Sequence, residues 1–281
     1  MAKAASVKRI IKSVALIINY KTFIVTILSV VSTYACFYYD FKADLPMTIV
    51  GIAIVFPVVF SIDSAYKRRE RALNFLADLK AHSVSLVLAF KDWMPEVDKK
   101  YSKPVRKNLV RLYAAMQDTF VEHNNEENHF ERTVYPIIAE LSSDLQGYRD
   151  EGLQAGEMSR VNQYLSKIVV DIENLRTILE YRTPVSLRAY SKVFIFSFPI
   201  LYAPYFVYHA QEFTEGLQYF TPIIFSFILV SLNNIQDHLE NPFDQVGEDD
   251  IHFRLDEFKK MLKWTSGSRE FEKIETELQE Q

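Results

Sequence analysis

The sequence contains little glycine and almost no cysteine. Only 7 of its 281 residues are glycine, which disfavours an all-β fold rich in tight turns. The single cysteine, Cys36, excludes an intrachain disulfide framework and any metal or iron–sulfur site built from several cysteines. The chain also lacks GxSxG, a phosphate-binding P-loop, HExxH and a glycine-rich dinucleotide turn. We therefore expect an all-α protein that is not an enzyme.

An excess of basic charge is also missing. The chain has 32 Lys and Arg residues against 36 Asp and Glu, a formal net charge of -4 at pH 7. This balance argues against a nucleic-acid partner. The mean hydropathy of -0.04 would suit a soluble protein, but this average hides a strong segregation of apolar and charged residues along the chain.

Four long segments contain no Asp, Glu, Lys or Arg. Each is long enough to cross a bilayer core of about 30 Å as a helix. A buried helix of a soluble bundle would normally keep a polar face, and these segments do not. Tyr and Phe gather near their ends, as at a membrane interface. The predicted membrane segments are Thr22–Tyr39, Leu45–Ile62, Val193–Gln211 and Gly216–Gln236.

Short acidic connectors, DFKAD and EFTE, join these segments into two hairpins. Basic residues gather before the first segment, after the second and before the third. By the positive-inside rule, both termini and the region between the hairpins face the cytoplasm. The start of the chain lacks the cleavage site of a signal peptide. We expect a multi-pass protein of the cell (inner or plasma) membrane, in contact with membrane lipids.

The cytoplasmic middle is predicted to be helical, because apolar residues recur at helical spacing within 109–120 and 161–179. The second membrane segment continues without Pro or Gly to Phe90, which predicts one long helix. A loop is expected at Glu122–Arg132, and Pro184 should separate the last cytoplasmic helix from the third membrane segment. The predicted parts are residues 1–62 (first hairpin), 63–192 (cytoplasmic helices), 193–236 (second hairpin) and 237–281 (cytoplasmic C-terminal segment).

Two histidines, His123 and His129, flank the acidic loop and raise the alternative of a metal-dependent membrane enzyme. Their spacing within a loop matches no recognised ligand pattern, so a solvated loop is favoured. Loss of a reproducible turnover on replacing either histidine would revive the enzyme hypothesis.

Two motifs together resemble the bestrophin family of pentameric ion channels. In that family the second membrane helix is followed by Ala-Tyr-x-Arg, which corresponds here to Ala65-Tyr66-Lys67-Arg68. The last membrane segment is followed by Asn-Pro-Phe or Asp-Pro-Phe, here Asn241-Pro242-Phe243. The two hairpins and the helical cytoplasmic middle match as well. The resemblance implies an all-α homopentameric channel for small ions, with the chain itself as its partner.

The resemblance also places Ile52, Phe56 and Phe60 at the narrow neck of the pore. Spaced four residues apart, they share one face of a helix, and five copies would form apolar rings that can gate by excluding water. Phenylalanine edges carry positive partial charge, which favours anions such as chloride. Pro57 removes a backbone donor in this helix and predicts a kink. The alternative is that the stripe packs against the first or fourth membrane segment.

In animal bestrophins, acids after the last membrane segment form a calcium clasp with backbone carbonyls. The matching residues here are Asp244, Glu248, Asp249 and Asp250. Carboxylates are ligands suited to calcium, but the spacing is not that of an EF-hand. A solvated acidic turn or a helix cap is the alternative. No other cofactor is expected.

Two alternatives to a chloride channel remain open from the sequence. A cation channel of the same fold is the first, because acidic residues outnumber basic ones. A non-conducting membrane scaffold, binding a partner through its cytoplasmic helices, is the second. A scaffold should keep an apolar stripe exposed after assembly.

Overall fold

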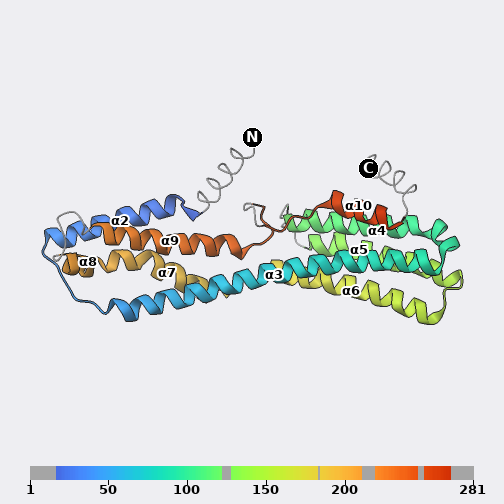
Figure 1. Cartoon of the computed structure of the whole chain (residues 1–281), viewed down its shortest axis with the longest axis horizontal. Helices are drawn as coiled ribbons and strands as arrows, with labels where there is room; N and C mark the ends of the chain where they lie inside the picture. The colour runs from blue at the N-terminus through green and yellow to red at the C-terminus, as the bar shows by residue number, and fades with distance from the viewer. Residues whose placement is uncertain (1–16, 122–127, 183, 211–218, 246–249, 267–281) are drawn as a thin grey trace. The chain divides into compact units, whose positions relative to one another are not determined.

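The structure is a computed structural model that describes residues 17–121, 128–182, 184–210, 219–245 and 250–266. Every regular element within these ranges is an α-helix or a short 3₁₀ turn (Figure 1). The chain divides into two units, which we treat separately. Unit 1 contains residues 1–69 and 181–242, and unit 2 contains residues 70–180 with the segments that follow Pro242, apart from 246–249.

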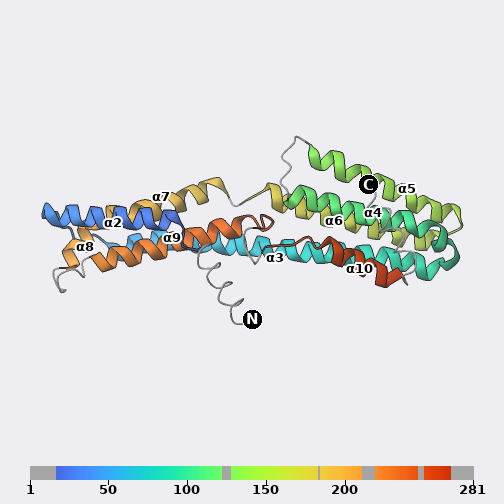
Figure 2. The same cartoon turned by 90° about the horizontal axis from the view of Figure 1, so that it is seen from above.

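Unit 1 is a bundle of apolar helices. Helix α2 runs along α9 and also packs on α7 and α8 (Figures 1 and 2). The core between them is formed by aliphatic and aromatic side chains such as Val58, Ile195 and Val230. The helices of this unit are α2 (Tyr20–Tyr38), the first part of α3 (Met47–Trp93), α7 (Val185–Leu201), α8 (Ala203–Ala210) and α9 (Phe220–Glu240).

Three stretches are long and apolar enough to cross a membrane: Tyr20–Tyr38, Met47–Trp93 and Ala155–Ala210. The last of these joins α6, α7 and α8 and passes through residue 183, which lies outside the described residues. The fourth predicted segment corresponds to α9, whose second half carries Asn233, Gln236 and other polar side chains. These side chains are buried inside unit 1. A membrane crossing by α9 stays a prediction.

The third predicted membrane segment is not one continuous helix. It is broken at Tyr202 between α7 and α8. Pro204 has no N–H to donate to the carbonyl of Ile200 four residues earlier, so the regular ladder cannot continue. The Ser32 hydroxyl of α2 donates to that carbonyl at 3.0 Å, and the Ser29 hydroxyl donates to the Pro199 carbonyl at 2.8 Å. The break is therefore stabilised by a neighbouring helix.

Small polar side chains also hold α2 against α9. The Ser226 hydroxyl lies 3.0 Å from the hydroxyl of Thr26, and the Asn19 amide donates to the Asn234 amide oxygen at 3.0 Å. In an apolar medium such hydrogen bonds and the small volume of the side chains favour close helix packing.

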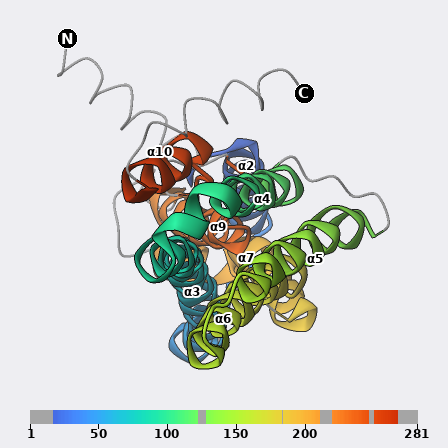
Figure 3. The ribbon, with the colours of Figure 1, turned by 90° about the vertical axis from the view of Figure 1, so that its right-hand side faces the viewer.

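Unit 2 is a second helical bundle with its own core. It contains the second part of α3 and four further helices, of which α4 packs along α5 and contacts α10 (Figure 3). Aromatic stacking ties the core together, with ring centroids 3.7 Å apart for Phe90 and Tyr148 and 4.4 Å apart for Tyr113 and Phe258. The further helices are α4 (Pro95–Val121), α5 (His129–Asp150), α6 (Ala155–Glu180) and α10 (Leu255–Ser266).

Two sequence predictions are confirmed and one needs correction. The second membrane segment does continue as one long helix, the 47 residues of α3. Pro184 is the residue immediately before α7. The predicted loop Glu122–Arg132 extends too far, because α5 already begins at His129. Asn128 adopts a left-handed conformation with φ 62°, which asparagine tolerates, and the helix starts directly after it.

Candidate functional site

The predicted neck residues form an exposed stripe on α3. Ile52, Phe56 and Phe60 are 52%, 57% and 59% exposed, and the rings of the two phenylalanines lie 6.0 Å apart. The other face of the helix is buried in the unit 1 core through Ile54 and Val58. The three side chains therefore point away from the helices of their own chain. The alternative, in which the stripe packs against the first or fourth predicted membrane segment of the same chain, does not agree with this exposure.

Pro57 lies inside α3, on the same turn as the stripe. It leaves the carbonyl of Ala53 without the donor that a residue with an N–H would supply. The Tyr190 hydroxyl of α7 donates to this carbonyl at 3.3 Å. A neighbouring helix thus compensates for the proline, which is how proline is tolerated in membrane helices. A kink at Pro57 stays a prediction.

The arginine of the first motif is held by a carboxylate at the end of α9. Arg68 Nη1 lies 3.4 Å from Glu240 Oε1 and 3.5 Å from the Glu240 carbonyl oxygen. Arg188 of α7 approaches the same carboxylate oxygen at 3.9 Å. Glu240 is buried, so one carboxylate joins three helices. Within the motif, Ala65 is fully buried and Tyr66 is half exposed.

A second carboxylate joins the same ends of other helices. Asp237 of α9 lies 3.0 Å from Lys192 of α7 and 3.8 Å from Lys21 of α2. The basic residues that flank three of the predicted membrane segments are therefore brought to one end of unit 1.

The second motif ends α9 and enters unit 2. Asn241 follows the last helical residue in an extended conformation, as expected for a residue before proline, and Pro242 comes next. Phe243 is fully buried in unit 2. Its ring lies 5.0 Å from that of Phe120, edge to face, and 6.1 Å from that of Phe253. Phe243 therefore anchors the segment that follows α9.

The acidic turn is only partly described. Asp244 and Asp250 belong to the described residues, whereas Glu248 and Asp249 lie outside them. The Gln245 amide donates to the Ile251 carbonyl at 2.8 Å, so this backbone oxygen is already engaged. No group of three or more His, Cys, Asp or Glu side chains suited to a metal occurs in the described ranges. The two described carboxylates alone fall short of a calcium shell of six to eight oxygens, and calcium binding stays a prediction.

The histidines of unit 2 have structural partners. His129 Nε2 lies 3.1 Å from Asp118 Oδ2, while His123 lies outside the described residues. His82 of α3 lies 2.6 Å from the carboxylate of Asp171 on α6. Burial raises the pKa of Asp171, and its hydrogen bond to His82 opposes this shift. These pairs connect helices and form no nucleophile–base arrangement.

Sequence reasoning missed two residues of the site, Glu240 and Tyr190. Glu240 directly precedes Asn241 of the second motif, and this position could have marked it as a candidate site residue. Tyr190 gave no signal, because its partner Ala53 lies far away in the sequence and becomes adjacent only through the packing of α7 on α3.

No protein-family model matches this chain, and no curated protein matches its sequence. Its fold is similar to crystal structures of a bacterial bestrophin homologue from Klebsiella pneumoniae. One variant of that protein gives a TM-score of 0.77 at 14% identity, covering 88% of this chain and 97% of that chain. A second variant gives 0.76 at 13% identity, covering 89% and 98%. The bestrophin-like fold predicted from the two motifs is thereby confirmed, and at this identity the likeness concerns the fold alone.

Proposed function

We propose that this chain is the subunit of a homopentameric membrane channel that passes small monovalent anions, chloride in particular. The observation that carries the proposal is the stripe of Ile52, Phe56 and Phe60, whose side chains are each more than half exposed on the face of α3 opposite the unit 1 core. Apolar side chains exposed on a membrane helix face lipid, another copy of the chain or a pore, and the resemblance to bestrophins places these three at the pore. The bestrophin-like fold supports a channel in preference to an enzyme.

In this proposal five copies of α3 surround the pore. The three stripe positions then form three successive apolar rings, which exclude water when the pore is narrow. The edges of Phe56 and Phe60 present positive partial charge to a passing anion. The geometry of an aromatic pair contributes only about 0.5–1.5 kcal/mol. A single edge contact with an anion is therefore expected to be weak, and selectivity depends on the repetition of the contacts around the ring.

The proposed topology has four crossings in two hairpins, formed by α2 with the start of α3 and by α7 and α8 with α9. Lys21, Arg68, Arg188 and Lys192 gather around Asp237 and Glu240 at one end of unit 1. This end is the cytoplasmic one by the positive-inside rule. Both termini then lie on the cytoplasmic side of the cell membrane.

A cation channel of the same fold is a second candidate, and one residue favours it. Asp63 follows the stripe on α3, one turn beyond Phe60, and is partly exposed. In the pentamer it would place a ring of carboxylates beside the neck, which attracts cations. Lys67 lies 2.7 Å from this carboxylate, however, and balances its charge. We therefore favour the anion channel over the cation channel.

The test is the reversal potential of the purified protein in planar bilayers under a potassium chloride gradient. A reversal close to the chloride equilibrium potential supports the proposal, and one close to the potassium potential supports the cation channel. Absence of current from a folded pentamer would instead favour a non-conducting scaffold. Recording with and without calcium tests the prediction for Asp244, Glu248, Asp249 and Asp250 in the same experiment.

A further inference from the structure

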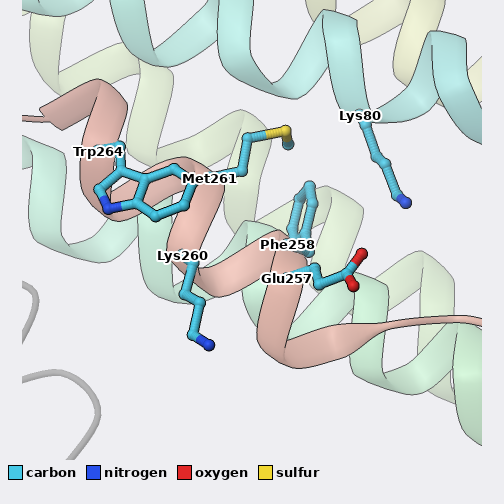
Figure 4. Close-up of a pocket in the computed structure, with 6 residues that line it drawn as sticks. All are labelled: Lys80, Glu257, Phe258, Lys260, Met261 and Trp264. Atoms are coloured by element: carbon cyan, nitrogen blue, oxygen red, sulfur yellow. The ribbon is translucent and has the colours of Figure 1, made fainter. Parts of the chain in front are cut away.

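A pocket lies between α3 and α10 in unit 2, away from the stripe (Figure 4). Its volume is about 490 Å³, and its lining residues are Lys80, Glu257, Phe258, Lys260, Met261 and Trp264. A neighbouring hollow of about 380 Å³ shares Lys80 and Glu257 and extends along α3 to Leu73. Volumes of this size are typical of sites for small organic molecules.

One side of the pocket is an apolar wall on α10. Phe258, Met261 and Trp264 lie on successive turns, and Figure 4 shows the thioether of Met261 between the two aromatic side chains. The Trp264 side chain is 77% exposed, which is unusual for the largest apolar side chain. Two contacts hold the wall in place: Phe258 stacks on Tyr113, and Lys91 Nζ donates to the Thr265 carbonyl at 3.1 Å. Among the described residues, none covers the indole of Trp264.

Lys80 brings a positive charge to the pocket from the opposite helix. Its ammonium lies 5.8 Å from the ring centre of Tyr113, and within the described part of the chain it forms no ion pair. Glu257, the one acid of the lining, is bound by Arg254 at 2.8 Å. Partial burial lowers the pKa of Lys80. Glu257 attracts this ammonium and Arg254 repels it. A half-buried ammonium that shares its carboxylate neighbour with an arginine is stabilised further by an added anion.

The second lysine of the lining has a different orientation. Lys260 extends from α10 away from Lys80 in Figure 4. The pocket thus offers one directed cation next to an aromatic and thioether wall, which matches a molecule with one anionic group and one apolar body.

We propose that this pocket binds an amphipathic organic anion, an apolar or aromatic carboxylate, with its carboxylate at Lys80 and its apolar body against Met261 and Trp264. The proposal is independent of ion conduction. It concerns only unit 2, so it stands or falls without reference to the stripe.

The chain contains 2 tryptophans, so Trp93→Phe leaves Trp264 as the single fluorescent reporter. The full-length variant in lipid nanodiscs is titrated with 4-iodobenzoate, a heavy-atom quencher of indole fluorescence, and with the uncharged 4-iodobenzyl alcohol. Saturable quenching by the carboxylate is expected, with the alcohol binding about tenfold more weakly. Lys80→Gln should weaken carboxylate binding by a similar factor, and the matched change Lys260→Gln should alter it less than about twofold.

Three results would overturn the proposal. Equal effects of Lys80→Gln and Lys260→Gln would show that Lys80 does not direct the anion. Equal quenching by the alcohol and the carboxylate would show simple apolar partitioning. No quenching of a correctly folded protein, with blue-shifted Trp264 emission, would show that the pocket is already covered and closed to the carboxylate.

Discussion

The hydroxyl of Tyr190 lies 3.3 Å from the backbone carbonyl of Ala53, which is the carbonyl that Pro57 leaves without a helical donor. The two residues belong to different helices, α7 and α3. A side chain thus replaces a backbone hydrogen bond at the level of the exposed stripe. Because the donor is a side chain, it can be removed by mutation without touching α3.

We expect Tyr190→Phe to lower the free energy of unfolding by about 1 kcal/mol, the net value of one hydrogen bond with its acceptor left unpaired. In Pro57→Ala the helix can supply its own N–H to Ala53, so Tyr190→Phe should cost much less in that background. Thermal unfolding of the four proteins of this double-mutant cycle, in one detergent, gives the coupling.

Additivity within about 0.3 kcal/mol would contradict this account. Tyr181→Phe is the matched control, because its ring is exposed and no hydrogen bond of its hydroxyl is found in the described part of the chain.

Glu240 should be essential for the stability of unit 1, because its buried carboxylate faces Arg68 and Arg188. Replacing it with the isosteric amide in Glu240→Gln removes the negative charge that faces both guanidinium groups. We expect a loss of about 3–5 kcal/mol, as for other broken buried pairs. Chemical denaturation or a melting curve measures it. Glu257→Gln, which breaks an exposed pair with Arg254, should cost less than about 1 kcal/mol, and comparable losses in both variants would refute the role of Glu240.

The pair of Asp63 and Lys67 should tune ion selectivity, because it follows the stripe on α3 and both side chains are partly exposed. In the proposed pentamer, Asp63→Asn leaves a ring of lysines and should move the reversal potential toward that of chloride. Lys67→Gln leaves a ring of carboxylates and should move it toward that of potassium. Shifts in the same direction, or none in either variant, would place this pair outside the ion path.

Tyr113 should make unit 2 sensitive to alkaline pH. Burial raises the pKa of its phenol, so the folded-state pKa lies above the unfolded value of about 10. The unfolded chain therefore loses this proton first, and the free energy of unfolding falls as pH rises past about 10. Tyr113→Phe should lose less stability than the wild type between about pH 10 and 12, by melting curves at each pH. An identical decline in both proteins would contradict the assignment.

The length of α3 and the grouping of its stripe residues on one face could be predicted from the sequence. The absence of Pro and Gly after Ile62 indicated that the second membrane segment continues, and α3 indeed extends to Trp93. The spacing of Ile52, Phe56 and Phe60 placed them on one face, and the structure exposes all three. Local periodicity is sufficient for such predictions because a helix imposes it residue by residue.

Interactions between segments that are distant in the sequence could not be predicted from the sequence. The third membrane segment looked continuous because it carries no charge, yet Pro204 breaks it, and Ser32 stabilises the break from another helix. The pairing of Arg68 with Glu240 likewise depends on how α3 meets α9. No local pattern encodes which side chain will reach a freed carbonyl or a buried charge.

The most direct test of the channel proposal is the conductance of the triple variant Ile52→Ala, Phe56→Ala, Phe60→Ala. The matched control changes Phe23, Ile27 and Val31 of α2 to alanine, since these residues have the same spacing and similar exposure. Wild type, variant and control are recorded as folded pentamers in planar bilayers under a potassium chloride gradient. We predict a reversal near the chloride potential for wild type and control, and larger, less selective currents for the stripe variant. Equal currents and selectivity in all three proteins would contradict a pore lined by α3.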